Sequence, residues 1–256
     1  MIGISVRKTI GIGDAVQFTS VPENYFKHTG QKLVDLNDHW VFDFNPYVIR
    51  GAADLEEKLQ IERKIDLWQL HCTDNPAQYR ERTVYLCNAE AHARHFSYTV
   101  KLNRPRLYRF EEFPFHQRLE IILHTQGKSH GTMPEYVVRH VLDKYGDAVR
   151  WIGLDDDWKY PLPRPPRIGI GGLWELAEAI SKARMFIGVD SGPSWIAKCY
   201  PDVVVKTLRL RPNPEDLRNW VPLECCRLHS HWDDRMALIH NPGEDDAGFT
   251  WSYKRL

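Results

Sequence analysis

Three short segments of the sequence combine glycine with polar side chains at points where a buried strand should end. The first, residues 8–14, reads Lys-Thr-Ile-Gly-Ile-Gly-Asp. Its glycines allow a ligand to approach the backbone, and the Asp14 carboxylate could take a proton from a hydroxyl group. Asp14 could equally be only the N-cap of the following helix. The dinucleotide fingerprint G-x-G-x-x-G is incomplete, because Val16 stands in the place of its third glycine.

The second segment, residues 124–129, reads His-Thr-Gln-Gly-Lys-Ser and is expected between a strand and a helix. Backbone amides, the Thr125 hydroxyl and the Lys128 ammonium group would converge there, where a phosphate could bind. The spacing differs from that of a P-loop, so the segment does not indicate nucleoside triphosphate hydrolysis. A solvated loop with one lysine is the alternative interpretation.

The third segment, residues 190–193, reads Asp-Ser-Gly-Pro and follows a predicted strand at 185–189. An Asp-Ser-Gly turn frees several N–H groups at the start of a helix, and Gly192 permits close contact with a diphosphate. Pro193 suits the first position of a helix. Such turns are common in α/β proteins, so this one indicates a ligand only in combination with the other segments.

The elements that must position these segments alternate between strand and helix along both halves of the chain. Strands are predicted at 2–6, 32–36, 65–71, 83–87, 119–124, 149–154, 185–189 and 203–208, with 41–48 irregular. Helices are predicted at 15–28 with a restart at Pro22, and at 54–63, 88–102, 134–145, 173–183 and 190–199. This alternation predicts an α/β fold with two parallel, doubly wound sheets. The turn-rich stretch 103–115 is the predicted linker between domains 1–115 and 116–256.

Composition excludes several classes of protein. Lys and Arg total 34 and so do Asp and Glu, and this zero formal charge gives no general case for nucleic-acid binding. No apolar run approaches the roughly 20 residues of a membrane span, and the amino terminus lacks the pattern of a signal peptide. We therefore expect a cytoplasmic protein, with peripheral membrane contact and self-association left open. Its five cysteines, odd in number, are expected to be reduced.

The three segments, taken in this order, resemble the motifs of glycosyltransferase family 9, the ADP-heptose heptosyltransferases of lipopolysaccharide synthesis. The amino-terminal motif corresponds to residues 8–14 with Pro22, and residues 44–48, Phe-Asn-Pro-Tyr-Val, resemble a further family element. The carboxyl-terminal motif is the best match, with a Leu- and Glu-containing helix at 173–184 leading into Gly188-Val189-Asp190-Ser191-Gly192-Pro193. The phosphate loop at 123–128 matches loosely, and Met133-Pro134 stands where Trp-Pro is usual.

The resemblance implies a GT-B architecture, with the acceptor bound by a reduced first domain and the nucleotide-sugar donor by the second. Asp14 would be the general base that deprotonates a glycan hydroxyl, with Lys8 and Gly13 in the acceptor-side loop. The donor, which is ADP-linked in the family, would contact Thr125, Lys128, Asp155, Asp156, Asp190, Ser191, Gly192 and Pro193. Among these, Asp155 or Asp156 would contact the ribose. No metal or other cofactor is expected, because helix dipoles and basic side chains meet the donor phosphates in this architecture.

Two motifs imitate metal sites, and two other functions compete with this interpretation. Asp155-Asp156-Asp157 imitates a metal-binding D-x-D motif but is interpreted as a solvated loop. Cys225-Cys226 with His229 and His231 matches no common zinc spacing. A non-catalytic GT-B relative that binds a nucleotide or glycan is the main alternative. A dehydrogenase is disfavoured by the incomplete glycine fingerprint.

Overall fold

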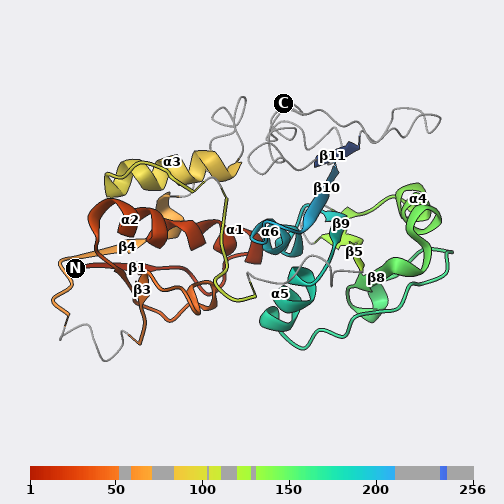
Figure 1. Cartoon of the computed structure of the whole chain (residues 1–256), viewed down its shortest axis with the longest axis horizontal. Coiled ribbons are helices and arrows are strands. Elements are labelled where there is room, and N and C mark those ends of the chain that lie inside the picture. The colour runs from red at the N-terminus through yellow and green to blue at the C-terminus, as the bar shows by residue number, and fades with distance from the viewer. Residues whose placement is uncertain are drawn as a thin grey trace.

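Two parallel β-sheets with flanking helices form the described part of the computed structural model (Figure 1). That part comprises residues 1–51, 59–70, 84–102, 104–110, 120–127, 131–210 and 237–240. The first sheet has the order β3-β2-β1-β4, with β1 Ile2–Ser5, β2 Leu33–Asp35, β3 Val48–Ile49 and β4 Arg63–Asp66. The second has the order β11-β10-β9-β5-β8, with β5 Ile121–His124, β8 Val149–Ile152, β9 Met185–Val189, β10 Val204–Leu210 and β11 Ala237–His240. The predicted α/β fold with two parallel sheets and a smaller first domain is confirmed.

The helical segment after β1 bends at the position that proline predicts. It consists of α1 (Ile12–Gln17), a 3₁₀ turn (Phe18–Ser20) and α2 (Val21–Thr29), with Pro22 in the first turn of α2. Proline lacks a backbone N–H and has a helical φ, so it can begin a helix but not continue one. Gly30 ends α2 in the left-handed conformation at φ 73°.

Helix α3 (Val84–Phe96) corrects the prediction of a strand at 83–87. The run Thr-Val-Tyr-Leu-Cys is rich in β-branched and aromatic residues, which favours a strand locally. Ala89, Ala93 and Phe96 are nevertheless buried at helical spacing. The Phe96 ring meets Tyr25 of α2 edge-on at 5.8 Å. Tertiary packing on α2 therefore overrides the local preference of the sequence.

Further elements differ from the prediction at their ends or in kind, among them α3, which ends at Phe96 where a helix to residue 102 was predicted. β4 ends at Asp66 and continues as a 3₁₀ turn, Leu67–Leu70, where a strand to residue 71 was predicted. The short strand β3 lies within the stretch predicted as irregular. β11 follows β10, which was predicted to be the last strand. The predicted helix at 54–63 falls largely outside the described residues, and its last residue belongs to β4.

The second domain follows the predicted order of helices closely. α4 is Glu135–Tyr145, α5 is Leu173–Ser181 and α6 is Gly192–Lys198. The segment after β5 forms a small antiparallel hairpin of β6 (Gln126–Gly127) and β7 (Gly131–Thr132). This hairpin stands between β5 and α4, so the second sequence segment does not lead directly into a helix as predicted.

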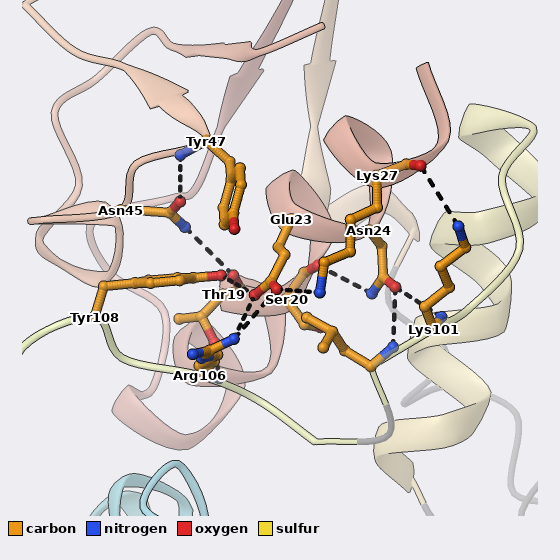
Figure 2. Close-up of polar contacts among 11 residues, drawn as sticks. Thr19, Ser20, Glu23, Asn24, Lys27, Asn45, Tyr47, Lys101, Arg106 and Tyr108 are labelled. Carbon is orange, nitrogen blue, oxygen red and sulfur yellow. Dashed lines mark hydrogen bonds and ion pairs between the residues drawn. The ribbon is translucent and has the colours of Figure 1, made fainter. Parts of the chain in front are cut away.

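The segment after α3 is attached to α2 and the 3₁₀ turn before it by hydrogen bonds from its backbone N–H groups to side-chain oxygens (Figure 2). The side-chain oxygen of Asn24 accepts the N–H groups of Lys101 and Leu102 at 2.8 and 3.0 Å. The Thr19 hydroxyl accepts the N–H of Arg106 at 2.8 Å. Arg106, in the described part of the predicted linker, is therefore attached to the first domain. The proposed boundary at 115–116 lies outside the described residues.

A buried carboxylate, Glu23, completes this attachment (Figure 2). Its side chain is only 1% exposed and receives Arg106 at 3.2 Å, Lys27 at 2.5 Å and the Tyr108 hydroxyl at 2.5 Å. Burial alone would raise the pKa of Glu23, but the hydrogen bonds from Lys27 and Tyr108 and the nearby positive charges outweigh it and lower the pKa. Glu23 is thus ionised and neutralised by the segment that crosses it.

Candidate functional site

The two domains meet where α1 and α6 begin, in the middle of the molecule in Figure 1. A Cβ atom added to Gly13 would stand 2.7 Å from Cδ1 of Trp195 in α6. Conversely, a Cβ added to Gly192 would stand 2.8 Å from Cβ of Ile12 in α1. The first and third sequence segments, far apart along the chain, are therefore in direct contact. Gly192, expected to approach a diphosphate, makes its close approach to Ile12.

Asp14 lies in the first turn of α1 rather than at its N-cap. The N-cap is Gly11, whose extended backbone (φ −62°, ψ 146°) allows the helix to begin at Ile12. The interpretation of Asp14 as the cap is therefore wrong. The half-buried carboxylate bends back toward Gly11, with Oδ2 3.1 Å from the position that a Cβ of Gly11 would take. A negative charge in the first turn is also favoured by the helix dipole.

The turn at residues 190–193 is held by hydrogen bonds among its own side chains and those of α6. Ser191 is the N-cap of α6, and its N–H donates to the Ser194 hydroxyl oxygen at 3.0 Å. The Ser194 hydroxyl lies 2.8 Å from the Ser191 carbonyl oxygen and 3.4 Å from Oδ1 of Asp190. Asp190 is 5% exposed, and Pro193 occupies the first turn of the helix as predicted. The turn is thus a rigid structure in which the Asp190 carboxylate faces Ser194.

His124, at the end of β5, contacts this turn. Its Nδ1 lies 3.2 Å from the Ser191 hydroxyl oxygen, and that hydroxyl lies 3.1 Å from the carbonyl oxygen of Val189. Burial lowers the pKa of His124 to about 4, although the charge of Asp157 acts in the opposite direction. The ring is therefore neutral at pH 7. The sequence alone could not connect His124 with Ser191, because it does not show that β5 and β9 are neighbours.

Thr125 and the hairpin after it lie beside the same turn. Thr125 is 1% exposed, and its carbonyl oxygen accepts the N–H of Met133 at 2.7 Å. A Cβ added to Gly127 would stand 3.4 Å from the carbonyl oxygen of Asp190, so the second and third segments adjoin. Lys128, the expected phosphate ligand, lies outside the described residues.

The three carboxylates after β8 differ in their exposure and in their partners. Asp155 and Asp156, the predicted ribose contacts, are exposed in the 3₁₀ turn Asp155–Asp157. Asp155 pairs with Arg167 at 2.6 Å. The charge that acts on His124 comes instead from Asp157. The Asp157 carboxylate also accepts the N–H of Leu154 at 2.7 Å. The sequence did not single out Asp157, because three consecutive aspartates do not indicate which of them acts on His124.

A second titratable cluster, not predicted, stands at the carboxyl end of β2. Asp35 is fully buried, and its Oδ2 accepts the N–H of His39 at 2.8 Å and lies 3.7 Å from Nε of Arg50. Burial raises the pKa of Asp35 to about 6 despite these partners. Burial, followed by the charges of Arg50 and Lys8, lowers the pKa of His39 to about 4. Lys8, predicted in the acceptor-side loop, is exposed close to this cluster.

Trp174 of α5 forms another contact between the two domains. Its Nε1–H donates to Oδ2 of Asp43 at 2.8 Å, and its ring lies edge-on to Trp40 at 6.0 Å and to Phe44 at 5.6 Å. The Arg109 guanidinium lies 4.8 Å from the Phe44 ring and 5.5 Å from the Trp174 ring. The two domains are therefore joined through α5 as well as through α6.

The described residues hold neither a candidate metal centre nor a candidate membrane span. Within those ranges no three His, Cys, Asp or Glu side chains gather in a way that could hold a metal ion. The cysteine and histidine motif at 225–231 falls outside them. No helix among the described residues has the length and apolar character needed to cross a membrane.

Two parallel-sheet domains that meet at their carboxyl-end turns define a GT-B-like fold. Solved structures share it: E. coli heptosyltransferase WaaC with ADP has a TM-score of 0.62 at 12% identity, covering 98% of this chain and 97% of that one. A family 9 glycosyltransferase of Veillonella parvula has a TM-score of 0.61 at 14% identity, covering 95% and 88%. The iron-containing dodecameric glycosyltransferase TibC of enterotoxigenic E. coli has 0.55 at 18%, covering 80% of this chain and 58% of that one.

These comparisons confirm the predicted resemblance at the level of the fold: the chain is built like the heptosyltransferases and other family 9 glycosyltransferases. No protein-family model matches the sequence. No curated protein matches it either. The assignment of the fold therefore rests on three-dimensional similarity.

Proposed function

We propose that the protein is a glycosyltransferase that moves a sugar from a nucleoside-diphosphate donor to a glycan hydroxyl without a metal ion. The observation that carries the proposal is the contact of the Asp14 helix with the turn at residues 190–193 and with the helix after it, through Ile12 on Gly192 and Gly13 on Trp195. This contact between α1 and α6 supports a shared site, in which the Asp14 carboxylate of the first domain would act on a donor held by the turn of the second. The heptosyltransferase fold supports the same reaction class, and WaaC has been solved with ADP.

In the proposed reaction Asp14 accepts the proton of the acceptor hydroxyl as its oxygen bonds to the anomeric carbon of the donor sugar. The bond from that carbon to the diphosphate oxygen breaks, and the nucleoside diphosphate leaves with the bonding electrons. Attack from the opposite face inverts the anomeric centre. Lys128, Thr125 and the turn at residues 190–193 would stabilise the charge that develops on the leaving group.

A thermal-shift experiment with ADP, other nucleoside diphosphates and their sugars, each with and without EDTA, tests donor binding. A ligand at 100 times its dissociation constant should stabilise the protein by about 2.7 kcal/mol. An unchanged shift in EDTA would support the metal-independent proposal. Asp14→Asn should then abolish sugar transfer while donor affinity stays close to that of the unmodified protein. Equal loss of transfer and of donor binding would contradict the assignment of Asp14 as the base.

A non-catalytic, nucleotide-binding function is the second candidate, and one observation favours it. The apolar Ile12 side chain lies against Gly192 at the place where a diphosphate was expected. Slow hydrolysis of a nucleotide sugar in the absence of acceptor would distinguish the enzyme, since a binding protein would leave the donor intact.

The proposal places the protein in the cytoplasm, and the reduced, buried Cys199 fits that compartment. The proposal does not specify whether the protein self-associates. TibC, a structural neighbour, is described as dodecameric. Sedimentation of the purified protein would settle the number of subunits. Flotation with anionic vesicles would test contact with a membrane surface.

A further inference from the structure

We infer that His124 is a positioning residue that holds the Ser191 hydroxyl ready for a phosphate oxygen of the ligand. This inference rests on the proposed function, in which the turn at residues 190–193 binds a nucleoside diphosphate. It adds a residue on β5 to a turn that belongs to β9 and α6, and it assigns a specific ring nitrogen to the task.

The hydrogen-bonding chemistry determines which nitrogen of His124 carries the proton. The Ser191 hydroxyl lies 3.1 Å from the Val189 carbonyl oxygen, which can only accept, so the hydroxyl proton points there. The Ser191 oxygen must then accept from Nδ1 of His124, 3.2 Å away. His124 is therefore the Nδ1–H tautomer, and this contact fixes the ring.

The backbone around His124 is shaped to admit its ring. His124 pairs with Gly188 of β9 in the parallel register. A Cβ on Gly188 would stand 3.1 Å from Cβ of His124 and 2.8 Å from Cε1 of Phe186, so a larger residue would displace both side chains. The Phe186 ring lies 6.4 Å from that of His124. The imidazole therefore has a fixed position behind the turn.

This arrangement prepares Ser191 for a ligand. When a phosphate oxygen arrives, the hydroxyl proton can turn from the Val189 carbonyl oxygen to the phosphate. The Nδ1–H of His124 continues to hold the Ser191 oxygen in place throughout. The ordering of the hydroxyl is then completed before binding, which reduces the entropy lost when the ligand binds.

Two substitutions separate the role of Nδ1 from simple packing. The amide nitrogen of Asn reaches the position of Nδ1, whereas that of Gln reaches the position of Nε2. By calorimetric titration with ADP, His124→Asn should bind within about threefold of the unmodified protein, and His124→Gln and Ser191→Ala about tenfold more weakly. His28→Asn, at an exposed histidine of α2, is the control and should bind ADP unchanged. Equal losses in the Asn and Gln variants would overturn the inference.

A measurement without ligand keeps the inference distinct from the proposed function. Two-bond ¹⁵N–¹H NMR correlations report the tautomer of each histidine in the whole chain. We expect the Nδ1–H form for His124, and a shift of its Nδ1 resonance in Ser191→Ala. The Nε2–H form would overturn the inference even if ADP binds. Failure of the unmodified protein to bind any nucleoside diphosphate would overturn the proposed function, and with it the role of the His124–Ser191 contact in binding.

Discussion

Gly13 lies against the indole of Trp195, so close that a methyl group on the glycine would stand 2.7 Å from the ring carbon Cδ1. One residue belongs to the first domain and the other to the second. The same relationship holds in the opposite direction, because Gly192 of the second domain lies against Ile12 of the first. Each domain therefore contributes a glycine that the other domain covers, and the two predicted ligand turns are positioned by the same contact.

Gly13→Ala should destabilise the protein through this contact. The added methyl group requires Trp195, only 6% exposed, to move, and overpacking of this kind costs about 1–3 kcal/mol. Urea unfolding measures the loss in the free energy of unfolding. Gly169→Ala is the control, because nothing lies within 4 Å of a Cβ at that position. Equal stability of the two variants would show that Gly13 and Trp195 do not pack as described.

Glu23→Gln should cost about 3 kcal/mol of stability, because it removes a buried charge from its partners. The loss follows from the ion pairs with Lys27 and Arg106, which would face a neutral amide. Glu135→Gln is a matched control, since Glu135 pairs with Arg139 on the surface of α4. That change should stay within about 0.5 kcal/mol in the same urea experiment. A Glu23 variant as stable as the Glu135 variant would contradict the role of the network.

Trp174→Phe should weaken the contact between the domains, because it keeps a ring but removes the N–H that Asp43 accepts. A double-mutant cycle with Asp43→Ala isolates the hydrogen bond, and we expect a coupling of about 1–2 kcal/mol. Trp158→Phe is the control, since its Nε1–H donates to Leu162 within the second domain. Combined with Asp43→Ala, it should show no coupling. Additive effects of Trp174→Phe and Asp43→Ala would rule out the bond.

Stability should fall as the pH is lowered from about 6.5 to about 4, in part because of His124. Its folded-state pKa of about 4 lies below the ordinary histidine value of 6.5, so the unfolded chain takes up the proton first. The stabilisation from the neutral ring is therefore complete above pH 6.5 and lost as the pH approaches 4. His124→Asn should flatten the plot of Tm against pH over this interval. His28→Asn should keep the slope of the unmodified protein.

The sequence was sufficient to predict elements whose local pattern and tertiary role agree. β9 has the predicted bounds, Met185–Val189. A short apolar run between a helix and an Asp-Ser-Gly turn is compatible with few structures other than a buried strand. Pro22 and Gly30 mark the start and end of α2 for reasons that lie in their own backbones. The start of α3 was mispredicted because its burial depends on α2, which lies about 60 residues earlier in the chain.

The site was predictable as a set of turns but not as an assembly. Periodicity cannot reveal that β5 lies beside β9, and so it could not connect His124 with Ser191. Nor could it show that Ile12 would cover Gly192, because close packing between domains depends on their relative orientation. Asp35 illustrates the same limit, since a buried aspartate at the end of a strand looks like any other until Arg50 is placed beside it.

The attachment of Arg106 and Tyr108 to Glu23 also affects when the first domain can fold during synthesis. Ribosomes release the amino terminus first, so Glu23 emerges long before Arg106 and Tyr108, two of the three partners that satisfy it. Until they emerge, the first domain would contain an incompletely compensated buried charge. The first domain should therefore not finish folding until the polypeptide has grown past residue 108. A nascent chain arrested before that length should remain sensitive to protease.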